Sequence, residues 1–168
     1  GGINNDIFLW DAESGEVFQK MTGDGGAIFT LAFSKDGRKL AFTQNVSANL
    51  NQTPFEKVFD LEAMQLSMQA PNTQNFLAPV VAKNGRQLTQ KSDYVLDIGN
   101  GMSIENTPNQ GRTIRSYTFT PSGNIVVGSA GSLVLYSNAG EPIRIFEGHS
   151  GEVWAVTVSA DGKLMASA

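Results

Sequence analysis

The sequence predicts an all-β protein built from a repeated unit of short strands. Three observations lead to this prediction: a ten-residue apolar template recurs four times, a second strand-and-turn pattern recurs in the same rhythm, and no segment of ten or more residues shows the 3.6-residue apolar stripe of a helix. Of the 168 residues, 40% are hydrophobic and 17% are charged, so the chain has enough apolar material for a core.

The first repeated pattern is a ten-residue template that ends in a tight turn. Each copy has a bulky apolar residue at positions one and six, and an Asp, Asn or Ser followed by Gly at positions nine and ten; the copies are 28–37, 76–85, 114–123 and 153–162. Glycine supplies the positive φ that a tight hairpin needs. β-rich residues follow three of the turns, at 40–42, 125–127 and 164–165. Each unit is therefore predicted as strand, turn, strand, although Pro79 removes one ladder donor from the second copy.

The second pattern adds two more strands to each period. A short apolar strand ends at an Asp or Ser and leads through a polar turn to a further strand; the strand-ending residues are Asp11, Asp60, Asp97 and Ser137. The turn glycines of the template follow one another at steps of 48, 38 and 39 residues, close to the roughly 40–45 residues of a four-stranded propeller blade. The predicted fold is an all-β propeller of four-stranded antiparallel blades, with about four blades in the chain.

Three short motifs make the prediction more specific. A Gly-His pair ends at His149, an Asp-Gly turn ends at Gly162, and a Leu-Trp-Asp sequence ends at Asp11. With these motifs the chain resembles the WD-repeat β-propeller family. The resemblance extends over essentially the whole chain, but only the last unit carries Gly-His and only the first carries Trp-Asp.

Both ends of the chain fall inside a blade. It opens at an expected third strand, 6–10, and stops after an expected second strand, 164–168. Read from tail to head, the two ends make a near-complete repeat, and the resemblance implies that they share one sheet, which removes exposed edges. The expected segments of this single propeller, 1–168, are the outer strands of the split blade (1–22), three blades (27–70, 75–106 and 113–147) and the inner strands of the split blade (152–168).

Three assemblies are compatible with a split blade. The favoured one is a fragment of a larger propeller. The others are a four-blade ring closed on itself and a homodimer in which two chains complete each other into eight blades. Closing one chain on itself costs less entropy than association if four blades can bend tightly enough.

The resemblance implies a structural role for the single histidine, His149. In WD-repeat relatives the matching His joins a hydrogen-bonded network with a Ser or Thr of the second strand, an Asp of the following turn and the Trp. Carried over to this chain, the partners of His149 are Ser167, Asn4 or Asp6, and Trp10. An ordinary loop His is the alternative, and a catalytic role is disfavoured because one His cannot build a multi-histidine metal site or a His-based triad within one chain.

The second position of the template holds the candidate partner-binding residues. They are Phe29, Leu77, Arg115 and Trp154. By resemblance this position lies near the start of the innermost strand, close to the mouth of the central channel. Trp, Phe and Arg are side chains that interface hot spots favour. Simple packing between neighbouring blades is the competing interpretation.

The long first step of the repeat comes from a polar insertion at 43–54. Because it connects the second strand of a blade to the third, it should emerge on the same face as the second template position. Connections of this length are often functional. A loop that varies within the family without binding anything is the favoured explanation.

Charge and composition exclude several classes of partner. The net charge of −4 and the absence of Lys and Arg clusters argue against nucleic acid, and no stretch approaches the roughly 18 apolar residues of a membrane span. The glycine-rich segments lack the Lys and Ser/Thr of a phosphate loop, so no cofactor is expected. With one His and no Cys in the chain, no metal is expected either. The compartment stays open, with the cytoplasm favoured over secretion because the first 30 residues contain no apolar signal core.

The predicted function is a non-enzymatic scaffold for protein–protein interaction, which presents binding loops on a rigid WD-repeat propeller. The alternative is an enzyme or a small-ligand-binding propeller with its site at the central channel. Several convergent acids or bases at the channel would favour the alternative. Aromatic and isolated charged residues at the rim favour the scaffold, and the four residues at the second template position support it.

Overall fold

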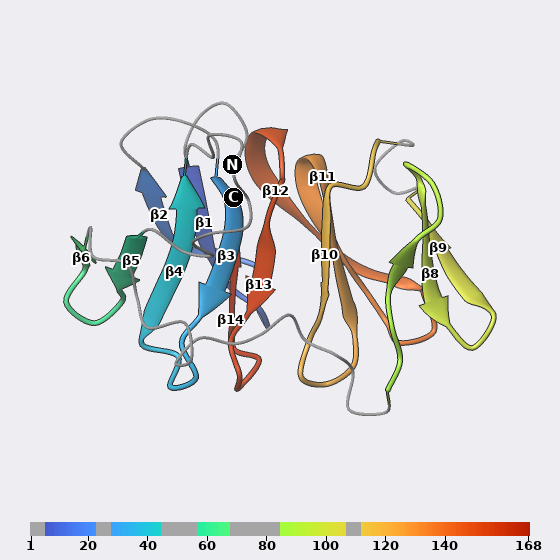
Figure 1. Cartoon of the computed structure of the whole chain (residues 1–168), viewed down its shortest axis with the longest axis horizontal. Coiled ribbons are helices and arrows are strands. Elements are labelled where there is room, and N and C mark those ends of the chain that lie inside the picture. The colour runs from blue at the N-terminus through green and yellow to red at the C-terminus, as the bar shows by residue number, and fades with distance from the viewer. Residues whose placement is uncertain (1–5, 23–27, 45–56, 68–84, 107–111) are drawn as a thin grey trace.

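The computed structural model describes residues 6–22, 28–44, 57–67, 85–106 and 112–168. In these ranges the regular elements are strands, which form four antiparallel sheets (Figure 1). The prediction of an all-β fold is therefore confirmed. Within the same ranges, there is no helix long and apolar enough to cross a membrane.

One sheet is built from both ends of the chain, and we call it the shared sheet. Its strands are ordered β13 (Val156–Val158), β14 (Leu164–Ser167), β1 (Asp6–Asp11) and β2 (Val17–Thr22). β1 pairs with β14 in antiparallel register, from Phe8 opposite Ser167 to Asp11 opposite Leu164. The junction between the two ends of the chain thus lies in the interior of the sheet, where both strands have their backbone groups paired.

The other three sheets each use consecutive strands. One is formed by β3 (Ile28–Phe33), β4 (Lys39–Gln44), β5 (Lys57–Asp60) and β6 (Gln65–Ser67). Another is formed by β7 (Thr89–Gln90), β8 (Val95–Gly99) and β9 (Met102–Glu105). The last is formed by β10 (Ser116–Phe119), β11 (Ile125–Tyr136) and β12 (Pro142–Glu152). The strand predicted at the start of the 76–85 template lies outside the described residues.

The β10–β12 sheet differs from the predicted pattern of four short strands. The sequence predicts one strand at 125–127 and another ending near Ser137, but β11 is a single strand that runs from Ile125 to Tyr136. Gly131 explains the continuity: its φ of +83° coincides with a register shift between Ala130 and Ser132, as in a β-bulge. The bulge accommodates the register shift, so the pairing of β11 with β12 continues on both sides of Gly131.

The turns form as the template predicts. Gly37, Gly123 and Gly162 have φ values of +73°, +89° and +76°, a region that glycine enters at no steric cost. In the turn before Gly162, Asp161 Oδ1 accepts hydrogen bonds from Ser159 Oγ at 2.7 Å and from the Lys163 amide at 3.0 Å. These two hydrogen bonds to the carboxylate therefore stabilise the hairpin turn.

The strand-ending Asp residues also stabilise turns, through hydrogen bonds from backbone amides. Asp11 Oδ1 accepts from the amides of Glu13 at 3.1 Å and Ser14 at 2.6 Å, just after β1. Asp60 makes the same pair of bonds after β5. The recurring Asp thus closes the turn between the third and fourth strands of a unit, where its side chain replaces a backbone acceptor.

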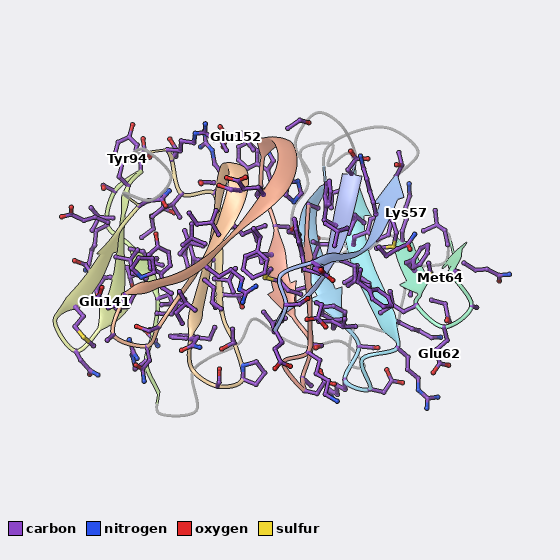
Figure 2. All side chains as sticks on the ribbon, turned by 180° about the vertical axis from the view of Figure 1, so that it is seen from behind. Lys57, Glu62, Met64, Tyr94, Glu141 and Glu152 are labelled. Atoms are coloured by element: carbon purple, nitrogen blue, oxygen red, sulfur yellow. The ribbon has the colours of Figure 1, made fainter. Side chains whose placement is uncertain are left out.

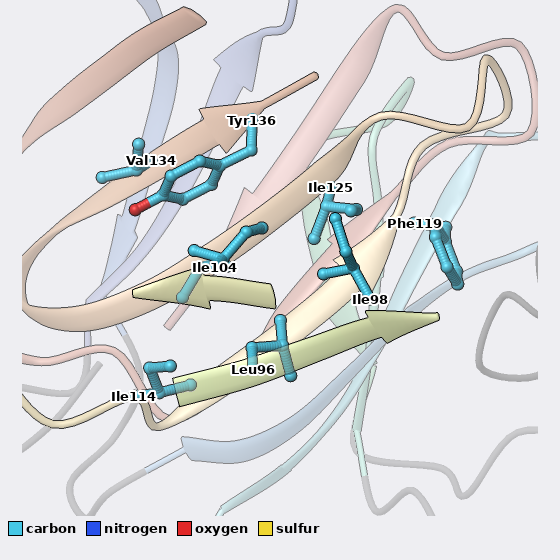
Figure 3. Close-up of a cluster of buried hydrophobic side chains, with 9 residues drawn as sticks. Leu96, Ile98, Ile104, Ile114, Phe119, Ile125, Val134 and Tyr136 are labelled. Carbon is cyan, nitrogen blue, oxygen red and sulfur yellow. The ribbon is translucent and has the colours of Figure 1, made fainter. Parts of the chain in front are cut away.

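The sheets pack face to face through three apolar clusters. One cluster joins the β3–β6 sheet to the shared sheet, a second joins the shared sheet to the β10–β12 sheet, and a third joins the β10–β12 sheet to the β7–β9 sheet. Figure 3 shows the third cluster, in which Tyr136 lies with Ile98 and Ile104. β3, β13 and β10 lie side by side along the middle of the molecule (Figure 1).

A glycine substitution tests the backbone requirement of these turns. Gly123→Ala should lower the free energy of unfolding by about 1–2 kcal/mol, because a Cβ there meets no atom but the left-handed φ is unfavourable for alanine. Gly151→Ala is the matched control, since its Cβ also meets nothing and its φ lies outside that region. Urea unfolding of both variants measures the difference; equal midpoints would contradict the explanation.

Candidate functional site

A buried hydrogen-bonded network joins three segments that are far apart in the sequence. Ser167 Oγ on β14 accepts from the indole Nε1 of Trp10 on β1 at 2.8 Å, and it lies 2.7 Å from Nε2 of His149 on β12. Trp10 is 1% exposed, Ser167 0% and His149 8%. The hydroxyl can accept from the indole and donate to the imidazole at once, so one small side chain satisfies both rings.

Aromatic rings surround the imidazole of His149. The Phe8 ring lies 4.5 Å from it between centroids, and Trp10 stacks on Phe8 at 5.5 Å and meets the edge of Phe146 at 5.6 Å. Burial in these surroundings lowers the pKa of His149 to about 3, with a smaller contribution from Lys20 and an opposing one from Asp6. The imidazole is therefore neutral at pH 7.

The predicted turn member of the network has a different set of contacts. Asp6 pairs with Lys20 Nζ at 2.8 Å and accepts from Thr22 Oγ1 at 3.1 Å, both across the β1–β2 pair. Burial acts to raise the pKa of Asp6, but the bonds from Lys20 and Thr22 outweigh it and the pKa is lowered. Asn4, the alternative member, lies outside the described residues.

Two of the four candidate partner-binding residues come together at one end of neighbouring sheets. Arg115 precedes β10 and Trp154 precedes β13; the guanidinium carbon lies 4.8 Å from the centroid of the indole ring. Phe29 lies in β3, but its side chain is not among those described, and Leu77 lies outside the described residues. The 43–54 insertion shares only its first two residues with β4, and the rest is not described.

An acidic residue that the sequence analysis missed completes this cluster. Arg115 Nε donates to Glu152 Oε2 at 2.8 Å, and the two side chains are each 34% exposed. Figure 2 shows Glu152 at the same end of the molecule as Tyr94. Its signal in the sequence is weak: Glu152 directly precedes the last copy of the template, and its charge is opposite to that of Arg115.

We call Arg115, Glu152 and Trp154 the rim cluster. Stacking on the indole and pairing with the carboxylate hold the guanidinium in one place, although at this exposure the ion pair itself contributes little to stability. The bond to Glu152 uses one of five N–H donors, and the other four have no acceptor among the described residues. The cluster therefore presents an ordered cation with free donors beside a half-buried aromatic ring.

No group of three or more His, Cys, Asp or Glu side chains within the described ranges could hold a metal ion.

The family comparison agrees with the geometry around His149. The family model described as WD domain, G-beta repeat matches residues 140–168. By this match, residues 140–168 form a WD repeat. The matched repeat contains His149, Trp154 and Ser167, and it spans β12 of one sheet together with β13 and β14 of the shared sheet. The predicted resemblance to the WD-repeat family is confirmed.

WD repeats generally mediate protein–protein interaction, and WD-repeat domains are typically non-enzymatic scaffolds. No curated protein matches the chain.

Removing the Ser167 hydroxyl tests the network. Ser167→Ala leaves the indole N–H and the imidazole nitrogen without this partner in a buried site, so the free energy of unfolding should fall by about 2–4 kcal/mol. Ser103→Ala, an exposed serine on β9, is the control and should change it by less than about 0.5 kcal/mol. Urea denaturation followed by tryptophan fluorescence measures both, and similar values for the two variants would contradict the role of Ser167.

The pKa of His149 predicts a pH dependence of stability. Above pH 6.5 the imidazole is neutral in both states; below it the unfolded chain binds a proton that the folded chain, with a pKa of about 3, does not. Stability should therefore fall by about 2 kcal/mol from pH 7 to pH 5 and keep falling toward pH 3. The Asp residues with lowered pKa values lose their contribution only as the pH falls below about 3.8, outside this window.

Because His149 is the only histidine, the variant His149→Gln isolates this effect. Its unfolding free energy should be nearly constant between pH 7 and pH 5. An equal slope in the parent chain and in the variant would show that another group causes the dependence.

Proposed function

We propose that the chain is a non-enzymatic interaction scaffold, a WD-repeat propeller that binds a protein partner through the rim cluster. The single observation that carries the proposal is the stacking of Arg115 on Trp154 beside Glu152, at the start of two neighbouring inner strands. Trp and Arg are the residue types that most often dominate binding energy at protein interfaces.

The proposal treats the four sheets as propeller blades. The proposed limits are those expected from the sequence, 27–70, 75–106 and 113–147 for three blades, and 1–22 with 152–168 for the blade shared by the two chain ends. The third of these blades differs in one respect, because β12 continues to Glu152. The side-by-side arrangement of β3, β13 and β10 supports this interpretation, because the innermost strands of blades line the axis of a propeller.

The rim cluster suits a protein partner for a thermodynamic reason. A partner that orders a free Arg or Trp side chain loses about 0.5–1.5 kcal/mol per side chain in rotamer entropy. Here the guanidinium is already held against the indole and the carboxylate, so less entropy remains to be lost on binding. The arrangement offers an apolar ring face, unpaired N–H donors for a carboxylate or carbonyl of the partner, and a carboxylate that can accept in return.

Quantitative affinity enrichment from a lysate of the source cells tests the proposal. The amount of partner recovered should be at least tenfold lower with Trp154→Ala than with the parent chain. This difference corresponds to about 1.4 kcal/mol of binding free energy. Phe18→Ala is the matched control, because Phe18 is an aromatic residue on β2 that is 64% exposed and lies outside the cluster.

Thermal unfolding must show that both variants are folded at the temperature of the enrichment. Equal recovery with Trp154→Ala and Phe18→Ala would contradict the rim cluster as the binding surface. A charge reversal, Arg115→Glu, should act like Trp154→Ala, since it places a second carboxylate beside Glu152 and removes the free donors.

A further inference from the structure

A pocket of about 230 Å³ opens between the shared sheet and the β10–β12 sheet, at the end of the strands opposite the rim cluster. Two hairpin turns form its mouth: 120–124 between β10 and β11, and 159–163 between β13 and β14. The turns are close together, because a Cβ placed on Gly162 would lie 3.6 Å from Cδ of Pro121.

The walls of the pocket are apolar and come from both sheets. They are formed by Val126, Leu135, Phe146, Val158 and Met165. These residues belong to the cluster that joins the two sheets, so the pocket is a hollow at the end of a well-buried core. A large apolar group that entered it would be removed from water on most of its surface.

The lining residues at the mouth of the pocket are polar, and one of them is charged. Thr120, Ser122 and Asn124 contribute neutral groups, and Asp161 is the charged lining residue. Hydrogen bonds from Ser159 and the Lys163 amide hold the pKa of Asp161 below its ordinary value, so the carboxylate is ionised at neutral pH. Both bonds go to Oδ1, which leaves Oδ2 without a donor among the described residues.

We propose that this pocket is a second binding site, which takes one Phe or Leu side chain from a peptide segment of a protein partner, with a neighbouring Lys or Arg of the peptide paired to Asp161. Size supports a single side chain, because pockets for cofactors and drug-sized ligands enclose about 300–1,000 Å³. Charge supports the basic neighbour, because the lining residues include one carboxylate and no cation. The site goes beyond the proposed function, with which it shares only the premise of a protein partner.

Amide NMR shifts of the labelled chain, titrated with short peptides, test the site. The probe is Ac-Gly-Lys-Phe-Lys-Gly-NH2; one control replaces both Lys by Glu, and another replaces Phe by Ala. The first peptide should shift amides in the 120–124 and 159–163 turns and leave those of 152–154 unchanged. Both control peptides should bind at least tenfold more weakly.

Two variants test whether the charge of Asp161 contributes to peptide binding, and Asp36 provides the matched control. Asp161→Asn removes the charge and retains the Oδ1 acceptor. It should weaken binding of the Lys-Phe-Lys peptide about fivefold or more. Asp36→Asn is the control: Asp36 makes the same two bonds in the turn after β3, to Ser34 Oγ at 2.6 Å and the Arg38 amide at 3.1 Å, and it does not line the pocket. It should leave binding unchanged.

Filling the pocket gives an independent readout. Ala12 lines the pocket and is only partly buried, so Ala12→Phe should occupy the space and abolish the turn shifts. Equal effects of Asp161→Asn and Asp36→Asn, or equal binding of the Glu peptide, would overturn the proposal. So would shifts centred on Trp154, or binding of free phenethylammonium as tight as that of the peptide. Trp154→Ala should leave this titration unaltered, which separates failure of this site from failure of the rim cluster.

Discussion

The antiparallel pairing of β1 with β14 is the constraint on which the rest of the structure depends. It brings Trp10 to within 2.8 Å of Ser167 across 157 residues of sequence, and so it creates the binding place for His149. It also gives the shared sheet two apolar faces. Ile7 and Leu9 pack toward the β3–β6 sheet, while Phe8 and Trp10 pack toward the β10–β12 sheet. Two of the three apolar clusters therefore draw residues from both β1 and β14.

The WD repeat and the sheet are out of phase, and this offset joins neighbouring sheets. The matched segment begins on the outer strand of the β10–β12 sheet and ends on the inner strands of the shared sheet. His149 links the two sheets, because its backbone belongs to the β10–β12 sheet while its imidazole contacts Ser167 of the shared sheet. The rim cluster lies where the chain passes from one sheet to the next. Glu152 ends β12, Trp154 precedes β13, and both contact Arg115.

The ten-residue template and its recurrence along the chain predicted strands and turns from the sequence, because burial and the positive φ of glycine are requirements of single residues that a local pattern can show. The family resemblance also named Trp10, Ser167 and His149 together. The continuity of β11 was missed, since a bulge at Gly131 depends on the partner strand. The Arg115–Glu152 pair and the pocket were missed for a related reason. Each depends on which two sheets are neighbours, and no single segment of sequence carries that information.

The shared sheet has a consequence for the order of events during synthesis. Trp10 leaves the ribosome 157 residues before Ser167, which at about 5–20 residues per second is a delay of roughly 8–30 seconds. Throughout that delay, the edge of β1 that will receive β14 has no native partner, while its apolar residues have only part of their cluster. Nascent chains therefore carry an open strand edge that other chains can pair with. Protection of this edge from misassembly therefore comes only once β14 has been made.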